Sequence, residues 1–247
     1  MAAMMRGVPR GLTLHAGFTL TELSVVLVIV TLLISGMILP LSAQDNIRRA
    51  QDTQRTLGDA SEALIGFATT HDRLPCPAVD GATGVESPSG GGAVCTATTG
   101  FLPATTLGIS PVDQNGYALD AWNQRIRYAV TSANGGAFTT TSGMRSATLT
   151  ALAPNLRVSV SAAAAATDLT TTAVAVIWSV GKNGSDLTTG GVSADESENP
   201  NPNSGAHPDP TVDRFVSHEP TPAFDDIVVW LSPNILFNRM IAAGRLP

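Results

Sequence analysis

The most constraining feature of this sequence is an apolar run of 24 residues near its N-terminus, from residue 18 to residue 41. Glu22 is the single charged side chain in this run. As an α-helix the run would be about 36 Å long, whereas the hydrocarbon core of a bilayer is about 30 Å thick and the apolar part of a secretory signal usually has about 7 to 15 residues. The pattern therefore predicts a transmembrane helix over residues 18–41. Arg6 and Arg10 precede it without any acid, and if this short leader dominates the orientation, the N-terminus is cytoplasmic.

The position of Glu22 needs an explanation of its own. A carboxylate inside an apolar span costs about 2.5 to 3.5 kcal/mol on insertion scales and normally has a partner. The run contains no basic side chain that could be this partner. Either Glu22 lies near enough to the interface to reach water, or its partner is a new α-amino group created by cutting the chain just upstream.

The residues around Glu22 carry a family resemblance. His15-Ala16-Gly17, followed by Phe18-Thr19-Leu20-Thr21-Glu22-Leu23 and the apolar run, resembles the prepilin leader junction of type IV pilins and type II secretion pseudopilins. The resemblance implies that a prepilin peptidase cuts after Gly17 and methylates the new N-terminus at Phe18. It also implies that Glu22 neutralises the terminal amine of a neighbouring subunit and so sets the register of a filament.

The pattern and the resemblance together divide the chain into four parts. Residues 1–17 are the predicted leader, residues 18–41 the transmembrane or filament-core helix, residues 42–70 its amphipathic continuation, and residues 71–247 a periplasmic globular head. The continuation has apolar residues at spacings of three, four and three, which is typical of a helix that packs one face on a domain. These residues are Leu57, Ala60, Leu64 and Phe67.

The head alternates short β-prone stretches with turn signals. We expect strands within residues 125–130, 156–160, 172–180 and 226–231, an acidic surface loop over residues 183–226, and a C-terminal helix over residues 233–243 with Ser232 as its N-cap. The predicted fold class is α+β: a long N-terminal transmembrane helix packed on a small, mostly antiparallel β-sheet head, as in pilins.

Cys76 and Cys95 bracket a loop rich in Gly, Pro and Ser. Two cysteines cannot supply a four-ligand zinc site, and this pair is too widely spaced for a redox Cys-x-x-Cys motif. In an oxidising compartment a disulfide is the preferred interpretation, and it would stabilise the fold by roughly 3 kcal/mol. The alternative is two buried free thiols.

Two further segments extend the family resemblance. Residues 120–128 look like the Asp-Pro-Trp-Gly…Tyr segment of major pseudopilins, with Ala121 and Asn123 in place of the family's Pro and Gly. Residues 178–184, followed by Asp225-Asp226-Ile227, look like the family's calcium loop, which implies that Asp225 and Asp226 are calcium ligands. The alternative is that these two acids are solvated or form a turn before a strand, and Lys182 adds a cation close to the loop.

The charge balance and the motifs restrict the function further. Lys and Arg number 14 against 20 Asp and Glu, for a formal net charge of −6, so we expect no binding of nucleic acid. The sequence also lacks the common catalytic motifs for hydrolases, metalloproteases and nucleotide-binding enzymes, so we expect no enzymatic activity.

The resulting hypothesis is a structural subunit, either pilin or pseudopilin, of a type IV pilus or a type II secretion pseudopilus. Its predicted partners are the prepilin peptidase, further copies of itself or other pilin-like subunits in a filament, and the inner-membrane assembly machinery. Its predicted location is the inner membrane, crossed once, with the head in the periplasm, and then the assembled filament. The alternative is a membrane-anchored periplasmic binding or enzymatic domain whose N-terminal anchor is not cleaved.

Overall fold

The computed structural model describes residues 17–79, 83–163, 165–184, 193–199 and 214–246, with the backbone alone for residues 36–43. The predicted leader up to residue 16 and two parts of the predicted acidic loop, residues 185–192 and 200–213, lie outside the described residues. The chain divides into two compact units, Met1–Ile47 and Arg48–Pro247. Helix α1 (Leu20–His71) begins in the first unit and ends in the second.

The described residues contain no helix that is both long enough and apolar enough to cross a membrane. The predicted transmembrane helix over residues 18–41 is therefore wrong. The predicted single-pass location in the inner membrane, with a periplasmic head, is overturned by the same finding.

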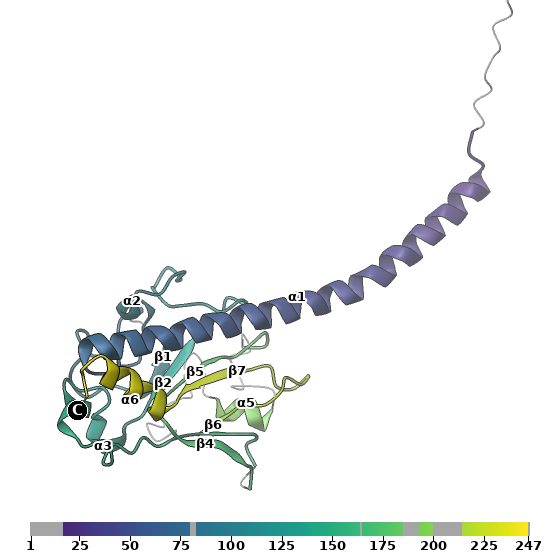
Figure 1. Cartoon of the computed structure of the whole chain (residues 1–247). Coiled ribbons are helices and arrows are strands. Elements are labelled where there is room, and N and C mark those ends of the chain that lie inside the picture. Colours follow the sequence, from purple (N-terminus) through teal and green to yellow (C-terminus); the bar gives the residue numbers. More distant parts are fainter. Residues whose placement is uncertain (1–16, 80–82, 164, 185–192, 200–213, 247) are drawn as a thin grey trace, which may run out of the picture. The chain divides into compact units, whose positions relative to one another are not determined.

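The second unit is an α+β arrangement of the C-terminal part of α1, several short helices and two sheets (Figure 1). The first sheet is antiparallel throughout, in the order β1-β2-β5-β7. The second has the order β4-β3-β6, with β3 antiparallel to β4 and parallel to β6. The strands are β1 (Thr99–Phe101), β2 (Arg127–Val130), β3 (Leu156–Ser159), β4 (Asp168–Ala173), β5 (Ala175–Ser179), β6 (Arg214–Val216) and β7 (Ile227–Leu231).

Apart from α1, the described helices are short. Helix α6 is the longest of them and has Pro233 in its first turn, where the missing N–H of proline has no helical acceptor to lose. The short helices are α2 (Ala104–Leu107), α3 (Ala133–Gly136), α4 (Gly143–Ser146), α5 (Ala194–Glu198) and α6 (Pro233–Ala242).

The C-terminal half of α1 packs on the first sheet. The side chains of its predicted apolar stripe, Leu57, Ala60, Leu64 and Phe67, are all buried. Leu57 and Leu64 belong to one core cluster with Tyr128 of β2 and Ile177 of β5. Spacings of three and four residues place these side chains on one face of a helix, so the stripe could be predicted from the sequence.

Strand β5 is buried on both faces because it lies between α1 and the second sheet. Ile177 packs in the cluster with α1, whereas Val176 and Trp178 pack in a second cluster with Phe215 of β6. The rings of Trp178 and Phe215 have centroids 5.0 Å apart. A strand covered on both faces has a continuous apolar sequence, and residues 175–178 show one.

Several elements differ from their predicted bounds. The predicted strand 172–180 is divided between β4 and β5, which belong to different sheets. Strands β1 and β6 were not predicted, and β6 lies within the predicted acidic loop. Each has only three residues, so it is formed by pairing with a neighbouring strand more than by its own propensity.

Candidate functional site

The predicted cleavage junction is exposed and lies outside helical structure. Gly17, Phe18 and Thr19 precede the first residue of α1, and Phe18 is 84% exposed. Exposed, non-helical segments are where proteolytic cleavage concentrates, so the local structure permits cleavage here. The structure does not test cleavage after Gly17 or methylation at Phe18, and both stay predictions.

Glu22 lies exposed in the first turn of α1. Its backbone N–H donates a hydrogen bond to Thr19 Oγ1 at 3.2 Å, and the N–H of Leu23 donates to the carbonyl oxygen of Thr19 at 3.1 Å. Thr19 is therefore the N-cap of α1, and the spacing of Thr19 and Glu22 is that of a capping box. A negative side chain in the first turn also stabilises a helix through its dipole. This stabilisation is an alternative explanation for an acid at position 22.

An apolar surface surrounds this turn of the helix. Twelve large hydrophobic residues between positions 18 and 34 are 43 to 85% exposed. They are Phe18, Leu20, Leu23, Val25, Val26, Leu27, Val28, Ile29, Val30, Leu32, Leu33 and Ile34. An exposed apolar surface of this extent marks a site of interaction, because isolated exposed hydrophobic residues are ordinary but contiguous ones are not.

The second candidate is a cluster of carboxylates in the second unit. One oxygen atom from each of Glu196, Asp225 and Asp226 lies within 4.8 Å of the others. Glu196 is 1% exposed and Asp226 is 5% exposed. The structure thus brings the two predicted residues together and adds Glu196, which lies in α5 and carried no signal in the sequence beyond its place in an acidic segment.

Hydrogen bonds join Asp225 to the predicted calcium loop. Its Oδ2 accepts from the backbone N–H of Lys182 at 2.9 Å and from that of Asn183 at 3.3 Å. Gly181, at φ +62°, leaves no space for a side chain, because a Cβ there would lie 2.5 Å from Asp225 Oδ1. The side chain of Asn183 donates to Glu196 Oε1 at 2.8 Å, so the loop contacts two of the three carboxylates.

The electrostatics of the cluster favour protonation or a bound cation. Burial raises the pKa of Asp226 well above its ordinary value, and the nearby Glu196 and Asp225 raise it further, although hydrogen bonding from Asn199 and the charge of Arg127 oppose this. Burial also raises the pKa of Asp225, against the hydrogen bonds from Lys182 and Asn183. Bringing like charges together away from water disfavours the ionised forms of both acids.

Comparison of the chain with protein-family models, with curated proteins and with solved structures finds no match.

The carboxylate cluster fits a hard divalent cation. Calcium takes about six to eight oxygen ligands, and Asp225 Oδ1 is a buried oxygen that accepts no hydrogen bond from the described residues. Glu196, Asp225 and Asp226 would hold the ion. The side chain of Lys182 is exposed, and the backbone N–H of this residue donates to Asp225. Calcium binding by Asp225 and Asp226 stays a prediction, and the alternative, that these acids order a turn, is also supported by the hydrogen bonds to Asp225.

The segment that resembles the Asp-Pro-Trp-Gly motif forms a turn around Asp120. Its Oδ1 accepts hydrogen bonds from the backbone N–H groups of Trp122 and Gln124, both at 2.8 Å, and its Oδ2 accepts one from the hydroxyl of Ser179. Asn123 has φ +62°, a left-handed conformation that Gly adopts most easily and Asn next. Asn at this position is therefore a suitable replacement for the family's Gly.

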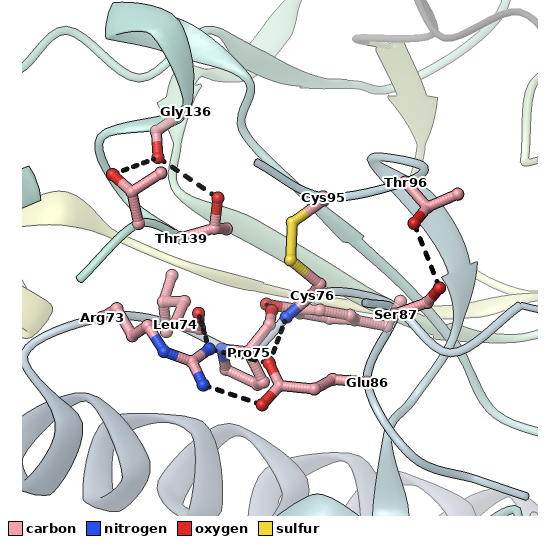
Figure 2. The surroundings of a disulfide bond; sticks show 12 residues. Arg73, Leu74, Pro75, Cys76, Glu86, Ser87, Cys95, Thr96, Gly136 and Thr139 are labelled. Carbon is pink, nitrogen blue, oxygen red and sulfur yellow. Dashed lines mark hydrogen bonds and ion pairs between the residues drawn. A yellow bond between two sulfur atoms is a disulfide. The ribbon is translucent and has the colours of Figure 1, made fainter. Parts of the chain in front are cut away.

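The predicted disulfide is present. Cys76 and Cys95 are joined, with a Cα–Cα distance of 5.3 Å, and the alternative of two free thiols is wrong (Figure 2). Figure 2 also shows a pair that was not predicted from the sequence, Arg73 and Glu86, beside the disulfide. Opposite charges 13 residues apart in a loop carry no periodic signal, so only the folded chain reveals this pair.

Proposed function

We propose that this chain is a structural subunit of a filament of the type IV pilus or type II secretion class. In this proposal a prepilin peptidase removes residues 1–17 and methylates Phe18, and the N-terminal part of α1 then packs against the same part of other pilin-like subunits. The observation that carries the proposal is the exposed apolar surface of α1, which directly follows an exposed junction of the prepilin type.

The physical argument is the cost of leaving this surface in water. Each Å² of apolar surface removed from water is worth about 25 cal/mol, so twelve large exposed hydrophobic residues are a substantial driving force for association. Helices that are apolar on every side are found where other elements surround them. Packing several copies side by side supplies such surroundings without any other component.

Glu22 would select the register of this packing. Cleavage after Gly17 creates a positive α-amino group on Phe18, four residues before Glu22 in the same chain. In the packed filament, this amino group would meet the Glu22 carboxylate of a neighbouring copy. A charge surrounded by apolar helices is strongly destabilised unless it meets an opposite charge. Only the stagger that pairs Glu22 with a neighbouring amine would satisfy this requirement.

The test is the intact mass of the protein isolated from cells. The proposal expects loss of residues 1–17 together with one added methyl group. An uncut chain, or a chain cut elsewhere, would show that Phe18 is not the mature N-terminus and would remove the proposed pairing. A deletion strain scored separately for secretion and for twitching then assigns the filament to a secretion system or to a pilus.

A further inference from the structure

A buried ion pair lies just beyond the end of α1. Arg73 is 5% exposed and Glu86 is 4% exposed, and two parallel hydrogen bonds join them, from Nη1 to Oε2 and from Nη2 to Oε1, both at 2.7 Å. The guanidinium also lies over the ring of Phe67, 5.0 Å from its centroid. Buried charges of this kind are stable only while both partners stay in place, because either one alone is strongly destabilising.

The segment that covers this pair is built around the guanidinium. The backbone N–H of Cys76 donates to Glu86 Oε2 at 3.1 Å, and the carbonyl oxygen of Gly90 accepts from Arg73 Nη2 at 3.5 Å. A Cβ on Gly91 would lie 2.0 Å from the same nitrogen, and Gly91 has φ +57°. Glycine is therefore needed for the chain to pass over Arg73.

The other contacts of this segment, residues 87–95, are mainly backbone hydrogen bonds. All nine residues from 87 to 95 are at least partly exposed, and Val94 is 66% exposed. Two of these bonds tie residues 87–95 to the rest of the unit: Ser87 N–H donates to the carbonyl oxygen of Pro77, and Thr141 N–H donates to the carbonyl oxygen of Gly92, both at 3.2 Å. A segment with so little buried apolar surface opens easily unless it is covalently closed, and the Cys76–Cys95 bond closes it (Figure 2).

We propose that the Cys76–Cys95 disulfide is a redox latch that holds residues 87–95 over the buried Arg73–Glu86 pair. A dithiol reductant breaks the bond between the two sulfur atoms: two electrons and two protons pass to the cysteines, which become thiols, and the reductant becomes a cyclic disulfide. The opened segment then exposes Arg73 and Glu86 at the end of α1, while the cores on both sides of β5 stay folded. Because linkage is reciprocal, weakening the ion pair also makes the disulfide easier to reduce.

Hydrogen exchange of the full chain, oxidised and after treatment with dithiothreitol, tests the latch. Reduction should lower the protection of the Cys76 and Thr96 amides at least about tenfold and leave the amides of β2 and β5 unchanged. Unchanged protection at Cys76 and Thr96 would show that the disulfide does not hold the segment. Equal loss of protection in β2 and β5 would show global unfolding and would also overturn the proposal.

A variant tests the reciprocal effect. In Glu86→Gln the equilibrium constant for reduction of the disulfide by dithiothreitol should be about tenfold larger than in the unchanged chain, as measured by alkylation of the thiols present at equilibrium. Asp113→Asn is the matched control, because it breaks the ion pair of Asp113 with Arg125, which are 2.8 Å apart and distant in sequence from both cysteines. Equal equilibrium constants for Glu86→Gln and the unchanged chain would contradict the latch.

Discussion

The side-chain amide of Asn199 donates a hydrogen bond to Asp226 Oδ2 at 2.8 Å, and the same nitrogen donates to the carbonyl oxygen of Val216 at 3.0 Å. The other end of this amide, Oδ1, accepts from the Val216 N–H at 2.9 Å. One asparagine thus joins the carboxylate in front of β7 to strand β6 of the other sheet. This contact holds Asp226 beside Glu196 and Asp225, and two of the predictions below concern these acids.

The first prediction concerns pH. Burial raises the pKa of Asp226 above its ordinary value of 3.8, so the folded chain binds this proton more tightly than the unfolded chain. Asp226 therefore contributes most to the stability of the folded chain below pH 3.8, and this contribution is lost as the pH rises through the raised pKa. In EDTA, Asp226→Asn should remove this loss and increase the free energy of unfolding at pH 7 by about 1 to 3 kcal/mol, measured by urea denaturation.

Asp113→Asn is the control of opposite sign for this experiment. Burial raises the pKa of Asp113, but hydrogen bonds from the Tyr117 N–H and from Arg125 outweigh this effect, and the pKa is lowered overall. Its contribution to stability is present above the ordinary pKa and is lost as pH falls. A destabilised Asp226→Asn chain at pH 7 in EDTA would contradict the assigned direction for Asp226.

The second prediction concerns calcium. If Glu196, Asp225 and Asp226 hold the ion, calcium at a hundredfold its dissociation constant should stabilise the chain by about 2.7 kcal/mol, seen as a higher melting temperature. Glu196→Gln should reduce this increase, because it removes one negative ligand. A melting temperature that is the same in calcium and in EDTA would eliminate the metal and leave the turn-forming role of these acids.

The third prediction uses neighbouring residues of α6. Leu236 is fully buried, whereas Ile235 is 51% exposed. Leu236→Ala should lower the free energy of unfolding by about 2 to 5 kcal/mol, because it leaves a cavity in the core shared with α1. Ile235→Ala should change it by less than about 0.5 kcal/mol. Circular dichroism during urea denaturation measures both, and similar losses for the two variants would show that α6 is not docked through Leu236.

The fourth prediction concerns the left-handed residue Asn123. Asn123→Ala should destabilise the chain by roughly 1 kcal/mol, because a Cβ without a compensating polar group is strained at positive φ. Asn123→Gly, which restores the residue expected from the pseudopilin segment, should be neutral or slightly stabilising. Thermal melting compares the two, and an equal loss in both would mean that the Asn side chain itself, and not its backbone conformation, matters.

The fifth prediction rests on the proposed filament. Glu22→Val should leave cleavage after Gly17 intact and strongly reduce incorporation into filaments, because the register-setting charge is lost. Thr19→Val is a matched control, since it removes the hydroxyl that caps α1 but keeps the carboxylate. If Thr19→Val abolishes incorporation while Glu22→Val does not, the role of this turn is helix capping and not pairing between copies.

The elements that depend on neighbouring residues could be predicted from the sequence. Periodicity and end signals predict the buried stripe of α1, the strands β2, β5 and β7, and helix α6. The observed bounds of these strands and of α6 lie within a few residues of the predicted ones. The cysteine pairing was equally accessible, because there was one possible intramolecular bond. The transmembrane helix predicted from the apolar run over residues 18–41 is wrong, because the described residues contain no helix that is both long enough and apolar enough to cross a membrane.

The sequence alone determined which segments are apolar, which face of residues 57–67 is buried, and which residues resemble a prepilin junction, since these depend on neighbours along the chain. The tertiary structure alone decided that Glu196 joins Asp225 and Asp226, that Arg73 meets Glu86, and that β5 is covered on both faces. The physical reason is that these contacts arise from strand order and loop closure. Many alternative pairings of these short strands would satisfy the same local preferences. Only one of them buries the core clusters on both faces of β5 at once.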